Sequence, residues 1–260
     1  EYKTEYDRAY IDEMVKKRNV RLKIKITLDF GYEKEIMQDL DFTCATYAKE
    51  KPVLDGVMGS DEWNSTWLTA DSIDRVPNID GWSGRDDVSI DCNLMWDEEN
   101  LYMGAIVRDN IHYNGEAPST IWRGDSIQFG IENSIFRNTL SFDETGASLE
   151  YTEIGIALVD GEPKVYRWSS QKNVQPIGEV RNFKVCVKRH DDVKTIYEFA
   201  IPWSELFESD YVLDKNTVFG YSMLVNDNDG AGRRGWIEYN TGIGSQKDST
   251  MFGRMKLIGG

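Results

Sequence analysis

Short segments in which apolar and polar residues alternate recur along most of this 260-residue chain. The segment 88–96 carries an apolar residue at every second position, and the polar turn 97–100 leads into an apolar-leaning segment at 101–107. A repeat of two is that of a β-strand with one face on a core and the other in solvent. Two such segments joined by a short polar turn predict a β-hairpin.

Further strand-like segments follow, separated by turn signals such as Asp160-Gly161 and Asp229-Gly230. They lie at 127–131, 154–158, 164–168, 183–187, 197–201 and 219–225. No regular succession of strands and helices is present, which argues against a parallel sheet with crossover helices. We therefore predict an all-β fold, a two-sheet antiparallel β-sandwich.

The N-terminal part differs from the rest in its pattern. Apolar residues at helical spacing predict a short amphipathic helix over 7–18, and the basic residues at its end suit the negative end of the helix dipole. Alternating segments at 20–30 and 40–48 predict two strands, which we expect to pair as a hairpin. An isolated hairpin is marginal in water and needs a neighbour to pack against.

A polar stretch that ends in Pro52 marks the expected domain boundary. Residues 1–51 are predicted to form the helix and hairpin, either as part of a neighbouring immunoglobulin-like domain or as an extension packed on the main one. Residues 52–260 are predicted to form the sandwich itself.

Charge and composition exclude several classes of partner. Acids outnumber bases 45 to 30, so the net charge is −15, whereas a nucleic-acid binder needs a basic face for phosphate contacts. No apolar run approaches the roughly 20 residues of a membrane span. The three cysteines, Cys44, Cys92 and Cys186, are far apart and are expected to be buried thiols rather than a disulfide framework.

Aromatic residues are abundant, while residue types common in catalysis are scarce. The chain has 8 Trp, 13 Tyr and 10 Phe but only 2 His and 3 Cys. Neither His lies in a nucleophile motif, and no glycine-rich phosphate loop is present. This balance favours binding over bond breaking, and we predict that the chain is not an enzyme.

Short motifs occur in a particular order between residues 53 and 258. They are VLDG at 53–56, EW at 62–63, LMWDEENLY at 94–102, VRD at 107–109, WRGDSI at 122–127, EFAIPW at 198–203, FG at 219–220, VND at 225–227 and FG at 252–253. In this order and spacing they resemble the family 9 carbohydrate-binding modules. The resemblance implies a β-sandwich, usually attached to secreted polysaccharide-degrading enzymes or surface proteins, that binds sugars without cleaving them.

The resemblance also implies a binding site in which two Trp side chains clamp a sugar ring. Trp122 corresponds to the first clamp position. Counting back without gaps from the FG motif at 252–253 places Gln246 at the second, and the surrounding loop 242–248 contains no aromatic residue. Three alternatives follow: another residue supplies the second wall, the ligand differs, or the site is lost.

Two other Trp residues are candidates for that second wall, and two polar residues for hydrogen bonds to the sugar. Trp82 lies in a loop between glycines, where exposure is expected, and Trp168 ends a short strand. Gln128 corresponds to a family acid that bonds sugar hydroxyls, and its amide can both donate and accept. Glu153 is a weaker candidate of the same kind. The alternative for Trp122 is a packing role, and for Gln128 and Glu153 a solvated strand position.

The remaining Trp residues receive structural interpretations. Burial is expected for Trp63, Trp67, Trp96 and Trp203, and Trp236 is left open.

Acidic residues at two places suggest a metal site. Asp227 and Asp229 lie in a turn, and Asp109 ends a strand. Calcium binds oxygen ligands of this kind, and the resemblance implies structural calcium. The alternative is an ordinary acidic turn.

The predicted function is therefore that of a non-catalytic, extracellular carbohydrate-binding module. Its expected partners are a plant or microbial polysaccharide and covalently linked neighbouring domains, with no nucleic acid and no membrane. One alternative is a structural spacer that has lost sugar binding. Another is a haem-binding electron-transfer domain with ligands among Met103, Met223 and His112, although methionines on strands more often fill the core.

Overall fold

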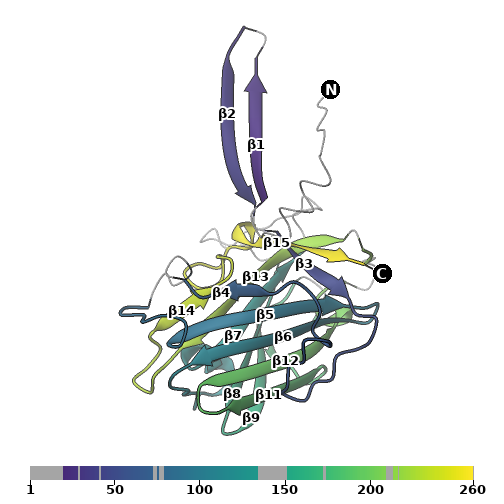
Figure 1. Ribbon diagram of the computed structural model, residues 1–260. Helices are drawn as coiled ribbons and strands as arrows, with labels where there is room; N and C mark the ends of the chain where they lie inside the picture. The colour runs from purple at the N-terminus through teal and green to yellow at the C-terminus, as the bar shows by residue number, and fades with distance from the viewer. Residues whose placement is uncertain are drawn as a thin grey trace.

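The computed structural model describes residues 20–28, 30–40, 42–72, 75, 79–133, 151–171, 174–208, 213–215 and 217–259. Within these residues the regular structure is strands and short 3₁₀ helices (Figure 1). The strands are β1 (Val20–Thr27), β2 (Glu33–Leu40), β3 (Phe42–Tyr47), β4 (Leu68–Ala70), β5 (Val88–Trp96), β6 (Asn100–Asp109), β7 (Ser126–Glu132), β8 (Tyr151–Val159), β9 (Glu162–Ser169), β10 (Gly178–Glu179), β11 (Lys184–His190), β12 (Lys194–Pro202), β13 (Val218–Asp227), β14 (Gly235–Glu238) and β15 (Gly253–Ile258). The 3₁₀ helices are η2 (Pro118–Arg123), η4 (Trp203–Glu205) and η5 (Ser249–Met251).

One continuous sheet carries all of these strands except β1 and β2. Its order is β10-β9-β8-β7-β13-β15-β3-β5-β6-β12-β11, with β14 added to β13 and β4 added to β5. Neighbouring strands are antiparallel apart from two parallel pairings, of β3 with β15 and of β3 with β5. The all-β prediction is therefore confirmed, and β3 joins the two halves of the sheet through parallel pairings that the sequence did not predict.

The sheet curls so that its two halves pack on each other. Figure 1 shows β5, β6 and β12 crossing in front of β7 and β8. Phe129 of β7 stacks on Phe199 of β12, with ring centroids 5.5 Å apart, and both belong to the main hydrophobic core. The alternation seen in the sequence explains this core, because every second residue of β5, from Ile90 to Trp96, points into it.

The other face of β5, β6 and β12 is covered as well. Trp63, Met95 and Tyr102 form a second buried cluster there. Trp63 also donates its indole N–H to the buried carboxylate of Glu198, over 3.1 Å. The segment that follows β3 thus shields a strand face that alternation alone assigns to solvent.

The N-terminal region differs from the sequence prediction in its pairing. β1 pairs with β2 rather than with the segment 40–48, and this hairpin projects from the body of the molecule (Figure 1). Most of the segment 40–48 forms β3 inside the main sheet, because it aligns with two strand edges there. The predicted helix over 7–18 lies outside the described residues. The division into 1–51 and 52–260 stays a prediction, although β3 ties residues before the expected boundary to the sheet.

Most structural expectations for single side chains are confirmed. Trp63, Trp96 and Trp203 are buried, as is Trp236, while Trp67 is half-buried against the second cluster. Among the cysteines, Cys44 and Cys92 are buried and Cys186 is half-buried, and none of the three described thiols forms a disulfide. No helix among the described residues has the length and apolar character needed to cross a membrane.

Candidate functional site

A cavity of about 400 Å³ brings together four of the six predicted ligand-binding residues. We call it the Trp122 cavity. Its lining consists of Trp122, Gln128, Glu153, Trp168, Arg233, Ile243, Gly244 and Lys247. Two indoles therefore share one cavity with two buried polar side chains, although these residues lie on four separate segments of the chain.

The short helix η2 positions Trp122 at the cavity. Its neighbour Ile121 is fully buried and anchors the turn in the fold. The buried amide of Asn114 donates to the carbonyl of Ile121 over 2.9 Å and to that of Asp125 over 3.0 Å. With the flanking backbone held in this way, the half-buried Trp122 ring has a defined place at the cavity wall.

Trp168 of β9 provides the second indole. Its N–H donates to the carbonyl of Ser119 in η2 over 2.9 Å, which ties β9 to the segment that carries Trp122. The ring lies over Gly155 of β8, where an added Cβ would come within 2.3 Å of it. Glycine at this position therefore lets the ring lie flat on the strand.

Gln128 and Glu153 supply the buried polar groups of the cavity. Gln128 donates to a Glu153 carboxylate oxygen over 2.8 Å and accepts from Asn226 over 2.9 Å. Lys247 donates to the same Glu153 oxygen over 2.6 Å. Both side chains are almost fully buried, at 4% and 1% exposure, so the alternative of solvated strand positions is wrong.

Two of the predicted binding residues are not among the residues that line this cavity. Trp82 is half-buried against the main core and donates its N–H to the carbonyl of Val88 over 3.0 Å, so the expected exposed ring is wrong. Gln246 is exposed and its amide lies against Met251. The next residue, Lys247, lines the cavity instead.

Arg233 was not predicted from the sequence. It follows β13 in the loop to β14, and its guanidinium carbon lies 5.4 Å from the ring centroid of Trp122 and 4.5 Å from that of Trp236. The only local signal is a pair of arginines ahead of a Trp. Its position depends on loop geometry, which sequence periodicity does not report.

A second polar site gathers acidic residues at the ends of β6 and β13. We call it the acidic cluster; it comprises Asp87, Asp109, Asp125, Asp227 and Asp229. Carboxylate oxygens of the three predicted metal ligands, Asp109, Asp227 and Asp229, lie within 4.8 Å of one another. The sequence prediction thus named three carboxylates that the fold brings together from two strand ends.

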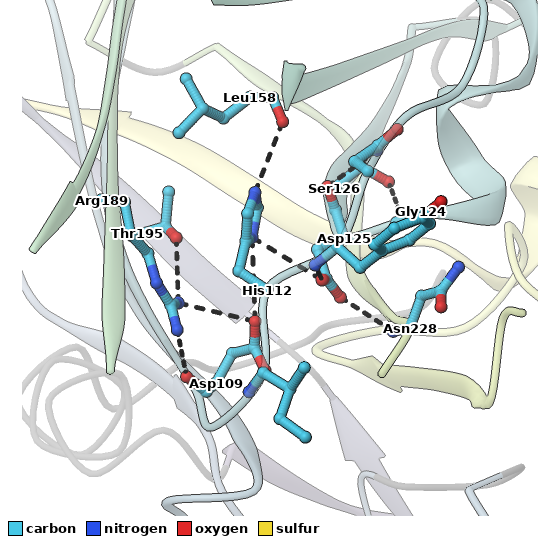
Figure 2. Close-up of polar contacts among 12 residues, drawn as sticks. Asp109, His112, Gly124, Asp125, Ser126, Leu158, Arg189, Thr195 and Asn228 are labelled. Carbon is cyan, nitrogen blue, oxygen red and sulfur yellow. Dashed lines mark hydrogen bonds and ion pairs between the residues drawn. The ribbon is translucent and has the colours of Figure 1, made fainter. Parts of the chain in front are cut away.

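Two arginines and one histidine border this cluster. The same nitrogen of Arg234 lies 2.9 Å from Asp87, 3.0 Å from Asp227 and 2.8 Å from Asp229. Arg189 lies 3.5 Å from Asp109. Figure 2 shows the His112 ring beside Asp109 and Asp125, at 3.8 Å and 3.6 Å, with its other nitrogen 3.4 Å from the carbonyl of Leu158.

Burial dominates the electrostatics of the acidic cluster. It raises the pKa of Asp125 to about 9, and the nearby charge of Asp109 acts in the same direction. It also raises the pKa of Asp227 to about 7, against the opposing effect of Arg234. The pKa of His112 is lowered, again chiefly by burial. These shifts mean that the carboxylates lack sufficient positive charge to hold them ionised.

The oxygen atoms of the cluster fit a hard cation. Both carboxylate oxygens of Asp227, one of Asp109 and one of Asp229 are buried without a hydrogen bond, although Arg234 and Arg189 lie at ion-pair distance from Asp227 and Asp109. Buried carboxylate oxygens without hydrogen bonds are costly, and calcium satisfies several of them at once. The chemistry of this donor set, with oxygens of Asp109, Asp227 and Asp229 close together, is therefore of the kind that suits calcium.

The residues named for haem ligation have other roles. Met103 and Met223 are buried in the main core, and the hydroxyl of Tyr221 contacts both sulfurs, at 3.7 Å and 3.4 Å. His112 lies at the acidic cluster instead. The core-filling interpretation of the two methionines is confirmed.

Known proteins resemble this chain in both sequence and structure. Residues 160–260 match the family model described as carbohydrate family 9 binding domain-like. A family 9 carbohydrate-binding module from Caldicellulosiruptor kristjanssonii, solved in complex with cellotriose, aligns over 84% of this chain and 94% of its own, with a TM-score of 0.60 and 19% identity. The resemblance to family 9 carbohydrate-binding modules is confirmed. The structure of a module from the same organism in complex with glucose gives a TM-score of 0.58 at 20% identity, over 84% of this chain and 96% of its own.

Relatives in sequence are much longer proteins. Endo-1,4-beta-xylanase A of Thermotoga neapolitana is 28% identical over 216 residues, which are 82% of this chain and 18% of that protein. Exoglucanase XynX of Acetivibrio thermocellus is 27% identical over 221 residues, 83% of this chain and 17% of its own length. The chain therefore spans less than a fifth of these relatives.

Proposed function

We propose that this chain is a non-catalytic carbohydrate-binding module and that the Trp122 cavity holds a sugar ring. The observation that carries the proposal is the joint presence of Trp122 and Trp168 with the buried amide of Gln128 and carboxylate of Glu153. The C–H faces of a pyranose pack on indole rings, while its hydroxyls need donors and acceptors close by. This cavity offers both.

The ligand class follows from the chemistry of the cavity and from the similar structures. Those structures hold cellotriose and glucose, so glucose-type pyranose residues of a polysaccharide are our first candidates. We also propose that the chain is covalently joined to further domains of a larger extracellular protein, as its short coverage of the xylanase and exoglucanase relatives suggests. The two halves of the curled sheet then serve as the two layers of a β-sandwich frame.

The arrangement of carboxylates favours binding over hydrolysis. Glycosidases place two carboxyl groups about the scissile bond. Among the described residues that line the Trp122 cavity, Glu153 is the single carboxylate, and its charge is paired with Lys247. We propose that Glu153 accepts hydrogen bonds from sugar hydroxyls.

We further propose that the acidic cluster binds a structural calcium ion. Asp109 and Asp227 end strands from the two halves of the sheet, so an ion shared by them would join those halves. Asp125 lies near η2, and one of its oxygens accepts from the backbone N–H of Asn228 over 2.8 Å. The cluster is thus connected to the segment that presents Trp122.

Isothermal titration calorimetry against glucose, cellotriose and xylotriose, with and without calcium, tests the function. Stacking and a few hydrogen bonds correspond to roughly 4–8 kcal/mol, so we expect a Kd in the millimolar to micromolar range. The decisive case is folded, calcium-loaded protein titrated with each sugar to a concentration roughly tenfold above a millimolar Kd. If no binding heat is measured with any of the three sugars, a structural spacer is favoured instead.

A further inference from the structure

The guanidinium of Arg233 is a positive charge at the Trp122 cavity that has no negative partner among the described residues. Two of its nitrogens donate to one oxygen, the side-chain amide oxygen of Asn226, over 2.9 Å and 2.6 Å. Its other close neighbours are the faces of Trp122 and Trp236. Each of these partners is neutral, and within the described part of the chain no carboxylate lies at ion-pair distance from Arg233.

The other charges near the cavity do not change this balance. Lys247 and Glu153 neutralise each other across 2.6 Å. Glu238 accepts from the indole N–H of Trp236 over 3.0 Å and is not placed against Arg233. Arg123 adds a further positive charge over the Trp122 ring, at 5.3 Å, but it is exposed to solvent. The lining therefore carries one net positive charge.

Burial of an unpaired charge is unfavourable, and Arg233 responds to it. The loss of solvent lowers the pKa of Arg233 to about 10, with no neighbouring charge to offset the effect. Such a group gains most from a ligand that brings a negative charge into the cavity. Within the described ranges, Asn226 is the hydrogen-bond acceptor of this guanidinium, which leaves further N–H groups on its terminal nitrogens for that ligand.

We propose that the preferred ligand is a pyranose that bears a carboxylate, that is, a uronic acid residue, with the carboxylate paired to Arg233. The inference rests on the proposed sugar-binding function and deepens it. A planar carboxylate matches the guanidinium fork and accepts two parallel hydrogen bonds from it. The ring of the same sugar residue then packs on the indoles of Trp122 and Trp168, and its hydroxyls reach Gln128 and Glu153.

Calorimetry with a matched pair of sugars tests this proposal on the intact chain. D-glucose and sodium D-glucuronate share stereochemistry and differ in the carboxylate. We expect glucuronate to bind about tenfold more tightly at low salt, because a charge-assisted hydrogen bond exceeds a neutral one by about this factor. The ratio of the affinity for glucuronate to that for glucose should fall as the sodium chloride concentration is raised, while the affinity for glucose should stay constant.

Two variants assign the preference to one residue. Arg233→Gln should bring the ratio of the affinity for glucuronate to the affinity for glucose close to one. Arg123→Gln, which removes an exposed charge over the same indole, should leave the ratio within about twofold of wild type because solvent screens that charge.

Each outcome has a distinct meaning. If wild-type protein binds glucose as tightly as glucuronate, the uronic acid inference is wrong while the sugar-binding function stands. If glucose 6-sulfate binds more tightly than glucuronate, the anion is a sulfate ester and the carboxylate assignment is wrong. If glucuronate, glucose, cellotriose and xylotriose all fail to bind to folded protein, the proposed function fails as well.

Discussion

Replacement of Trp122 by alanine is the most direct probe of the proposed site. The ring lines the cavity but belongs to none of the hydrophobic clusters of the described residues. We therefore expect Trp122→Ala to lower the free energy of unfolding by about 1 kcal/mol or less, as for other substitutions outside the core. A loss of sugar binding in this variant then cannot be attributed to unfolding.

The expected loss of affinity follows from the contact that the ring makes. Stacking of a flat ligand on an aromatic side chain contributes roughly 1–3 kcal/mol, which corresponds to about a 5- to 150-fold increase in Kd. The upper part of this range is expected for ligands that also use Arg233, because that side chain lies against the Trp122 ring. Titration calorimetry with cellotriose and with glucuronate measures both cases.

The matched control is Trp82→Phe. Trp82 packs on the main core and donates to the carbonyl of Val88, away from the residues that line the cavity. We expect this variant to lower the melting temperature while leaving the Kd unchanged. An affinity of Trp122→Ala within twofold of wild type would refute the assignment of the cavity as the sugar site.

Four further predictions concern the frame around the site. Gly155→Ala should weaken sugar binding several-fold by displacing the Trp168 ring, which an added Cβ would contact at 2.3 Å; calorimetry measures the loss. Arg167→Met should lower the free energy of unfolding in urea by about 3–5 kcal/mol, because it leaves the buried Glu205 without its ion-pair partner at 2.5 Å. Calcium at 100 times its Kd should increase the free energy of unfolding of the wild-type protein by about 2.7 kcal/mol and so raise its melting temperature. Asp227→Asn should abolish this increase. Without calcium, stability should fall as the pH rises through about 7, since the raised pKa of Asp227 makes the protonated form the stable one in the folded state.

Controls separate these effects from general destabilisation. Gly115 is exposed, with open space around its Cβ position apart from one contact at 3.7 Å, so Gly115→Ala should leave sugar binding unchanged. Magnesium in place of calcium should give a smaller increase in melting temperature, because it demands a stricter octahedral arrangement. A melting temperature that rises with pH in calcium-free buffer would contradict the pKa argument.

The sequence by itself determined the strand content and named four residues that the fold brings to one cavity. Alternation at 88–96 predicts β5 because the two-residue repeat is a property of the strand backbone, independent of its neighbours. Trp122 was named as a candidate through the resemblance to family 9 carbohydrate-binding modules, and the acidic turn at Asp227 through its oxygen-bearing residue types. The same alternation puts Ile127, Phe129 and Ile131 into the core and leaves Gln128 on the opposite face of β7.

Only the tertiary structure decided which of these residues meet. Trp168 lines the cavity because β9 is tied to η2, and Trp82 does not because its loop folds onto the core. Arg233 and Lys247 enter from loops, whose paths follow turn geometry and packing rather than a periodic pattern. Likewise, the segment 42–47 pairs with β15 and β5 rather than with β1, because hydrogen bonding to a sheet edge depends on which edge is available in space.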